Sequence, residues 1–167
     1  MWLDKVGTVL ADTVYKNGVL VAKDVTIEMP SVNFLTADFR AMGTMTMPVP
    51  GQIEAMEATV TKIGTDLGLR DMVMLESETL EYRWAQDVKT NDGTSKVVGC
   101  KAFLRSVPKG IPGISIDPGN ISESSIAYAV SRYPLFVDGE EYWLVDQLND
   151  ILRIGGKDYR KDINSLL

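Results

Sequence analysis

The sequence predicts a mainly β protein, an antiparallel β-sandwich or barrel with a long β-hairpin arm and one short flanking α-helix. Three observations lead to this prediction: frequent tight-turn dipeptides, alternating apolar and polar segments between them, and little helical periodicity. Such dipeptides favour the positive φ angles of tight hairpin turns, so their frequency in 167 residues indicates antiparallel sheets. The dipeptides are Asn17-Gly18, Asp92-Gly93, Asp138-Gly139 and Gly155-Gly156.

The first expected strand covers residues 19–29, directly after the first of these turns. Residues 79–88 and 96–107 alternate in polarity and flank the second turn, which predicts a long hairpin. Further strands are expected at residues 125–133 and 142–146. Alternation with a period of two predicts that each sheet has one buried face. The apolar side chains of these faces include Val25, Ile27, Met29, Leu80, Tyr82, Trp84, Val88, Val98, Cys100, Ala102 and Leu104.

One helix is expected over residues 65–75. Thr65 or Asp66 is positioned to cap its N-terminus, whereas Gly68 weakens it by roughly 1 kcal/mol relative to alanine. The expected buried stripe of this helix is Leu67, Met72 and Leu75. A second helix at residues 161–167 is possible, but it is too short to form without docking. The Pro- and Gly-rich residues 108–120 are expected to form a structured loop between strands.

Composition excludes several chemistries. The chain has no histidine and one cysteine, so Ser-His-Asp and Cys-His catalysis, His-ligated metals and intramolecular disulfides are excluded. Cys100 is expected to be a buried, unreactive thiol. Acidic pairs such as Glu76 with Glu78, or Glu140 with Glu141, are expected to be solvated charges. Carboxylate, lysine or hydroxyl chemistry, or no chemistry at all, remains. Our expectation is a protein that is not an enzyme, with no catalytic, cofactor-binding or metal-binding residues.

The charge balance bears on partners. Lys and Arg total 17 and Asp and Glu total 23, which gives a net charge of -6. Tight binding to nucleic acid requires clustered cations, so the acidic composition argues against it. An acidic surface along which DNA passes without being bound is still compatible with this composition. Neither a signal peptide nor an apolar run of membrane-spanning length is evident, so we expect no membrane binding and folding in a reducing cytoplasm.

The methionines are unevenly distributed. Six of the eight fall between residues 42 and 74, and residues 41–51 carry no charge. Met45, Met47 and Val49 alternate with threonine and proline, which fits either an edge strand packed on the core or an adaptable apolar surface for a partner. We expect a hairpin arm with residues 45–49 leading out and residues 53–61 returning. Its exposed edges would need cover from another subunit, which favours an assembly protein.

At this point the chain resembles a known family, the major tail tube proteins of contractile-tailed bacteriophages and of phage-tail-like bacteriocins (tailocins). The order and spacing of several segments across most of the chain carry the resemblance, and none of them is specific alone. A turn and strand at the N-terminus lead to Thr-Ile-Glu-Met-Pro at residues 26–30, and further matching segments occupy residues 39–44, 48–59, 133–140 and 145–158. The fold of this family is also similar to that of the secreted tube protein of type VI secretion systems.

The resemblance implies a structural subunit of the inner tail tube of a contractile injection particle. Hexameric rings would stack into a conduit that sheath contraction drives through a cell envelope. The implied partners are further copies of the chain, the sheath protein, baseplate or tube-initiator proteins, a tail terminator, a tape-measure protein in the lumen and, in a phage, DNA in transit. The expected location is a virion tail or tail-like particle assembled in the bacterial cytoplasm.

The resemblance also implies a single tail-tube domain over residues 1–167, with an arm within about residues 41–62 that contacts an adjacent ring. The candidate arm residues are Met42, Gly43, Met45, Met47, Pro48, Val49, Pro50 and Gly51. Two alternatives stay open on the residues alone. One is a monomeric β-barrel that binds a ligand with Tyr82, Trp84 and Trp143, and the other is a hydrolase that uses a carboxylate pair such as Glu76 and Glu78.

Overall fold

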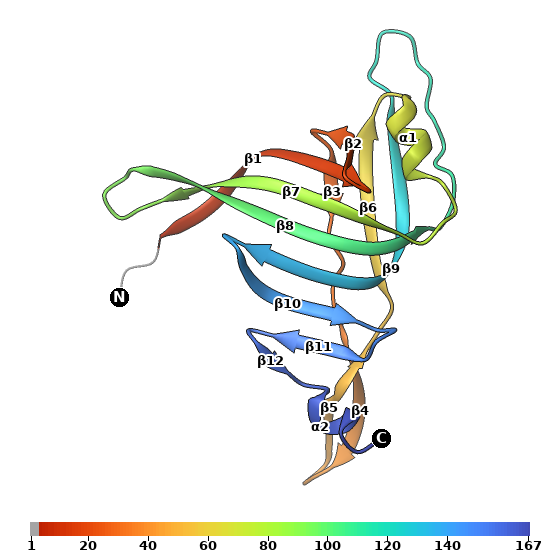
Figure 1. Cartoon of the computed structure of the whole chain (residues 1–167). Helices are drawn as coiled ribbons and strands as arrows, with labels where there is room; N and C mark the ends of the chain where they lie inside the picture. The colour runs from red at the N-terminus through yellow and green to blue at the C-terminus, as the bar shows by residue number, and fades with distance from the viewer. Residues whose placement is uncertain (1–3) are drawn as a thin grey trace.

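A computed structural model describes residues 4–167 as a mainly β protein with two short helices (Figure 1). All strand pairs are antiparallel. The largest sheet has the strand order β12-β11-β10-β9-β8-β7-β1-β2, and β6 joins β9 to β3. The strands are β1 Lys5–Lys16, β2 Val19–Lys23, β3 Thr26–Glu28, β4 Phe34–Arg40, β5 Thr44–Ile53, β6 Met56–Ile63, β7 Glu78–Lys89, β8 Ser95–Pro108, β9 Glu123–Val137, β10 Glu140–Asp146, β11 Ile151–Ile154 and β12 Lys157–Asp158.

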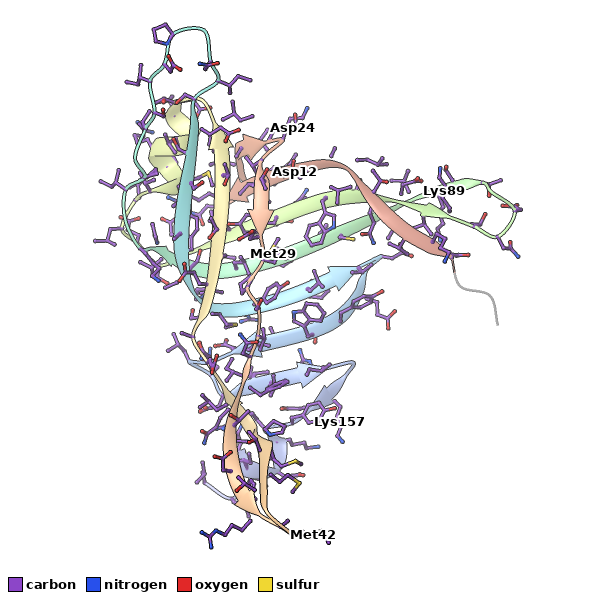
Figure 2. All side chains as sticks on the ribbon, turned by 180° about the vertical axis from the view of Figure 1, so that it is seen from behind. Asp12, Asp24, Met29, Met42, Lys89 and Lys157 are labelled. Atoms are coloured by element: carbon purple, nitrogen blue, oxygen red, sulfur yellow. The ribbon has the colours of Figure 1, made fainter. Side chains whose placement is uncertain are left out.

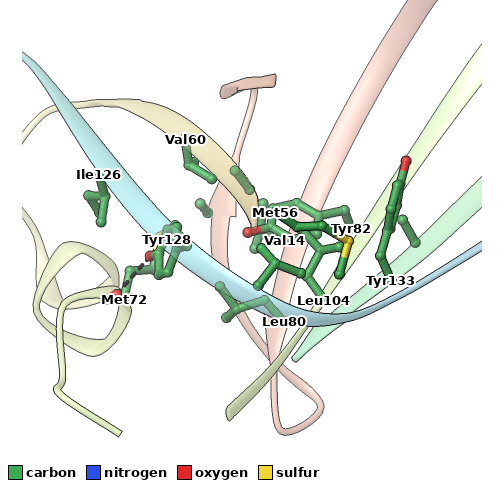
Figure 3. Packing of buried hydrophobic residues seen from close by; sticks show 14 of the residues in the cluster. Val14, Met56, Val60, Met72, Leu80, Tyr82, Leu104, Ile126, Tyr128 and Tyr133 are labelled. Atoms are coloured by element: carbon green, nitrogen blue, oxygen red, sulfur yellow. Dashed lines mark hydrogen bonds between the residues drawn. The ribbon is translucent and has the colours of Figure 1, made fainter. Parts of the chain in front are cut away.

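Strand β9 connects the two layers of the fold. Residues 123–130 of β9 pair with β6, residues 128–137 pair with β8, and residues 132–137 pair with β10. The core fills the space between these layers (Figure 3), where Val14, Val60 and Tyr82 are fully buried. The predicted antiparallel sandwich is therefore confirmed, with one long strand shared between its sheets.

Most predicted turns form as expected. Positive φ angles occur at Asn17 and Gly18, at Asp138 and Gly139, and at both glycines of Gly155-Gly156. The turn at residues 92–93 differs, because only Gly93 has a positive φ there. The Gly93 backbone N–H donates to the Thr90 carbonyl at 3.0 Å, and the hairpin closes through a wider loop than a two-residue turn.

The predicted strand at residues 19–29 is divided. Asp24 has a φ of 54°, which ends β2 and redirects the chain into β3. Strand β2 pairs with β1, whereas β3 pairs with β6 in the other layer. The single-strand prediction was wrong because an aspartate can adopt a left-handed conformation without a neighbouring glycine to signal it.

Helix α1 spans Leu67–Met72 and is shorter than predicted. The Asp66 side chain caps it by accepting a hydrogen bond from the Leu69 N–H at 3.0 Å. Its buried residues are Leu69 and Met72, so the expected stripe was wrong at Leu67 and Leu75, which are exposed. Helix α2 spans Lys161–Asn164, which lies within residues 161–167, where the second helix was considered possible, and it is shorter than that range.

Neither helix in residues 4–167 has the length and apolar character that a membrane-spanning helix needs. Over the same residues, no group of three or more acidic or thiol side chains is arranged to hold a metal ion. Cys100 is a buried free thiol, as predicted, and burial raises its pKa, with a smaller contribution from Asp138.

Candidate subunit interface

Strands β4 and β5 form a hairpin that projects from one end of the molecule, with Met42 at its tip (Figures 1 and 2). The predicted partner of the methionine strand was wrong. Residues 34–40 lead out and β5 returns, whereas β6 belongs to the body and pairs with β3 and β9. The alternating burial of Met56, Ala58 and Val60 explains this assignment, because these side chains fill the core.

The tip of the hairpin carries no glycine-led turn signal. Met42 has a φ of 50° and Gly43 a φ of 129°, so a non-glycine residue takes the first left-handed position. Such a conformation is uncommon for a methionine. The position of this turn, and the strand that precedes it, were therefore not predicted from the sequence.

The hairpin is amphipathic. Residues directly opposite each other in an antiparallel pair share a face. Ala37 lies opposite Met47 and Phe39 opposite Met45 on one face, and the other face pairs polar residues such as Asp38 with Thr46. The Thr46 hydroxyl donates to the Asp38 carboxylate at 2.7 Å.

The apolar face of the hairpin is exposed in the single chain. Phe39 is 53% exposed, Met45 and Met47 are each 44% exposed, and the Met42 side chain at the tip is fully exposed. A contiguous apolar surface of this kind on a projecting element indicates a contact with another molecule. The structure shows that this strand is not packed on the core, and its contact with a partner stays a prediction.

The base of the hairpin is fixed to the C-terminal segment. Gly51 has a φ of 73°, and a Cβ atom there would lie 2.6 Å from the Arg160 side chain. Arg160 donates through Nη1 to the Gly51 carbonyl at 3.1 Å and pairs through Nη2 with Asp150, also at 3.1 Å. These contacts hold the hairpin against α2, so the arm leaves the body in a defined direction.

The remaining candidate residues lie along β5 between tip and base. Pro48 is exposed and lies opposite Thr36, Val49 is half-buried, and Pro50 is exposed at an irregularity in the pairing. The structure thus brings all the predicted arm residues together on one strand and its turn. Sequence reasoning missed their partners on β4, although the alternation of Leu35, Ala37 and Phe39 was visible.

Further exposed apolar side chains lie on the body of the molecule. They occur on β1 and β2 and in the loop between β8 and β9. The pattern of alternating polarity in the sequence did not identify them as candidate contact residues. These residues are Val6, Val9, Leu10, Val19, Leu20, Ile111, Ile114, Ile116 and Ile121. An isolated chain that exposes so many large apolar groups has more than one surface suited to association.

The aromatic residues of the alternative ligand site do not come together. Tyr82 is fully buried in the core, and Trp84 and Trp143 line different cavities. The three aromatic residues therefore do not line one common cavity. Glu78 pairs with Lys16 at 3.0 Å, and Glu76 lies in the segment before β7.

Comparison with known proteins gives a family. The profile of the family described as phage tail tube protein FII matches residues 8–167. None of the curated proteins matches the chain. The match covers nearly the whole chain, and the chain belongs to this family of structural, non-enzymatic tail tube proteins. It is a component of a phage tail or a tail-like injection particle.

Solved structures share the fold. A chain from a cryo-EM structure of the sheath/tube terminator of the PVC extracellular contractile injection system aligns with a TM-score of 0.52 and 15% identity, over 75% of this chain and 92% of that chain. A chain from the PVC sheath-tube complex aligns with a TM-score of 0.51 and 14% identity, over 75% of this chain and 87% of that chain. A chain from the tube-terminating cap of the anti-feeding prophage aligns with a TM-score of 0.50 and 18% identity, over 75% of this chain and 87% of that chain.

Proposed function

We propose that this chain assembles into hexameric rings that stack into the inner tube of a contractile injection particle. Sheath contraction would drive this rigid conduit through a cell envelope. The observation that carries the proposal is the β4–β5 hairpin, which presents an exposed apolar face on an arm fixed at its base. An arm of this kind has a role in an assembly and is a liability in a monomer.

The proposal includes a single tail-tube domain and an inter-ring role for the arm residues Met42, Gly43, Met45, Met47, Pro48, Val49, Pro50 and Gly51. Contacts between two different patches of identical subunits produce an open filament when the rotation that relates neighbouring subunits does not close into a ring. The proposed partners are further copies of the chain, the sheath, a tube initiator or baseplate, a tail terminator and a tape-measure protein. DNA would pass through the lumen if the particle is a phage.

Polymerisation of the purified chain tests this function. Negative-stain microscopy and sedimentation at high protein concentration should show tubes of constant diameter. The double variant Phe39→Ser/Met45→Ser should stay in the supernatant, because it removes two exposed apolar groups of the arm without opening the core. The matched control Thr36→Ala/Thr44→Ala changes the opposite face of the same hairpin and should still form tubes.

Two results would contradict the function. One is wild-type protein that remains monomeric at every concentration and also in the presence of sheath and baseplate components. The other is a serine double variant that polymerises as readily as the wild type, which would remove the arm from the assembly.

A further inference from the structure

The projecting hairpin carries three exposed thioether groups. Met42 lies in its turn, and Met45 and Met47 lie on β5. The Met42 side chain is fully exposed, and the side chains of Met45 and Met47 are nearly half-exposed. Met45 lies directly opposite Phe39, so both side chains are on the apolar face of the hairpin. We call Met42, Met45 and Met47 the arm methionines.

Most of the other thioethers are shielded. Met56 and Met72 are buried in the core, and Met29 is partly buried against it. Within residues 4–167, Met74 is the one exposed methionine outside the hairpin, at 44%. It follows α1, which lies far from the hairpin in Figure 1. The chain therefore contains an exposed methionine away from the arm that serves as an internal control.

An exposed thioether is open to attack by peroxides. Hydrogen peroxide transfers one oxygen atom to the Sδ atom of methionine. The O–O bond breaks and an S–O bond forms, the sulfur loses two electrons, and the second oxygen of the peroxide leaves as water with both protons. The product, methionine sulfoxide, is polar, and methionine sulfoxide reductases convert it back to methionine. The Cys100 thiol is buried, so this reagent reaches the arm methionines more readily.

Oxidation converts the apolar face of the arm into a polar surface. A sulfoxide oxygen accepts hydrogen bonds, so covering it with apolar side chains costs free energy unless a donor is present. The hairpin offers no side-chain donor on this face, because Ala37 and Phe39 are apolar and the Thr46 hydroxyl donates to Asp38 on the other face. An oxidised arm is therefore a poorer contact surface than an unmodified one.

The position of the sulfur atoms gives the effect a direction. A thioether that another subunit covers is out of reach of peroxide, whereas the arm of a free subunit is exposed. Oxidation of free subunits therefore opposes their incorporation, and arms that are already covered are protected. Leucine would supply a similar apolar surface without this reactivity.

We propose that the arm methionines are oxidation sites at which peroxide blocks the assembly of free subunits and a methionine sulfoxide reductase restores it. The proposal rests on the proposed function, because it names a regulation of the same arm. It adds a chemical modification, its reagent and its sites to that function.

Partial oxidation of the wild-type chain tests the proposal without any substitution. Free subunits are treated with hydrogen peroxide until oxidised and unmodified chains coexist, the peroxide is removed, and the protein is concentrated until tubes form. Peptide mass spectrometry then compares the pelleted tubes with the supernatant. Sulfoxides of the arm methionines should be depleted in the tubes by roughly 5- to 30-fold, the factor expected for covering an unpaired polar group. The sulfoxide of Met74 should be equally frequent in both fractions.

Enzymatic reversal and substitution complete the test. Methionine sulfoxide reductases should restore the assembly of oxidised chains, whereas dithiothreitol alone, which reverses thiol oxidation at Cys100, should not. The triple variant Met42→Leu/Met45→Leu/Met47→Leu keeps the volume and apolar character of the arm, so it should form tubes after peroxide treatment. Its matched control, Met74→Leu, should remain as sensitive to peroxide as the wild type.

Several results would overturn the inference while the proposed function stands. Untreated wild type would form tubes, but arm sulfoxides would be as frequent in tubes as in the supernatant, or peroxide would still inhibit the triple variant. Recovery with dithiothreitol alone would also overturn it. If the triple variant does not assemble even when untreated, the distribution of sulfoxides in the wild type decides. Untreated wild type that never forms tubes would overturn both the inference and the proposed function.

Discussion

At the scale of single residues, two buried tyrosines differ in how their hydroxyl groups are satisfied. The Tyr128 hydroxyl donates to the Met72 carbonyl at 2.7 Å and so ties β9 to α1. The Tyr82 hydroxyl is buried without a hydrogen-bond partner among the described residues. Burial raises the pKa of both groups, so both hydroxyls are neutral across the physiological range.

Phenylalanine substitutions should separate the two tyrosines. Tyr128→Phe should lower the free energy of unfolding by about 1 to 3 kcal/mol, because it leaves the Met72 carbonyl unpaired. Tyr82→Phe should leave the free energy of unfolding unchanged or raise it by about 1 kcal/mol, because it removes an unsatisfied polar group. Urea denaturation of the two variants measures both effects, and equal destabilisation would contradict this description of the core.

The loop between β7 and β8 contains a strongly perturbed carboxylate. Hydrogen bonds from the Thr90 hydroxyl and from the Thr94 hydroxyl and backbone N–H lower the pKa of Asp92 to about 2, from an ordinary value of 3.8. Because the folded pKa is the lower one, the contribution of the charged form to stability is present above about pH 4 and is lost as the pH falls toward 2.

An NMR pH titration of the Asp92 carboxyl group tests this arrangement. The wild type should titrate with a pKa of about 2. Thr90→Val removes the largest of the three contributions, so the pKa of Asp92 should move up toward 3.8. A wild-type pKa already near 3.8 would show that these hydrogen bonds do not persist in solution.

At the scale of elements, helix α1 packs unusually closely against β2. A Cβ atom at Gly68 would lie 1.9 Å from the Val21 carbonyl oxygen, a backbone atom that cannot move aside. Helix propensity alone predicts that alanine here would stabilise the chain by roughly 1 kcal/mol. The packing predicts the opposite, because the glycine is what allows the helix to approach the strand.

Gly68→Ala should therefore lower the free energy of unfolding by about 1 to 3 kcal/mol, the usual range for overpacking. Gly99→Ala is a suitable control, because nothing lies within 4 Å of a Cβ atom placed there. Thermal or urea unfolding of both variants gives the comparison. A Gly68→Ala variant as stable as the wild type would mean that α1 does not hold this position.

Local patterns predicted most of the strands but not their partners. Alternation at Leu80, Tyr82 and Trp84 placed β7 within a residue of its observed start, and the hairpin to β8 followed from the turn between them. The partner of β5 was missed because Met42 hides the turn. The sharing of β9 between two sheets was also missed, because pairing with β6 and with β8 is a long-range choice that no local signal encodes.

The candidate contact surfaces likewise include one feature that a local sequence pattern encodes and one that depends on contacts between distant segments. The uncharged, methionine-rich character of residues 41–51 fitted either an edge strand packed on the core or an apolar surface for a partner, and the structure shows Met42, Met45 and Met47 exposed. The cavity of about 520 Å³ between β1 and β3 was not predictable, because it forms only when Asp24 turns the chain from one sheet to the other. A concave surface built from distant segments has no signature in a one-dimensional pattern.

At the scale of the whole molecule, the charge is unevenly distributed. The chain carries a net charge of -6, yet two pairs of cations lie directly opposite each other on the outer face of the large sheet. Arg83 faces Lys101 and Arg105 faces Arg132, and carboxylates offset the like charges, because Arg83 also pairs with Glu81 and Arg132 with Asp146. A conduit wall built from this face would not be uniformly acidic, so net charge alone does not describe a lumen.

The central claim is that identical chains stack head to tail through the β4–β5 hairpin. A cryo-EM reconstruction of tubes grown from the purified chain tests it most directly. We predict stacked hexameric rings in which Phe39, Met45 and Met47 of each subunit are covered by a subunit of the adjacent ring. A tube in which residues 34–53 contact no other subunit, or purified chain that gives only closed, non-stacking oligomers, would contradict the claim.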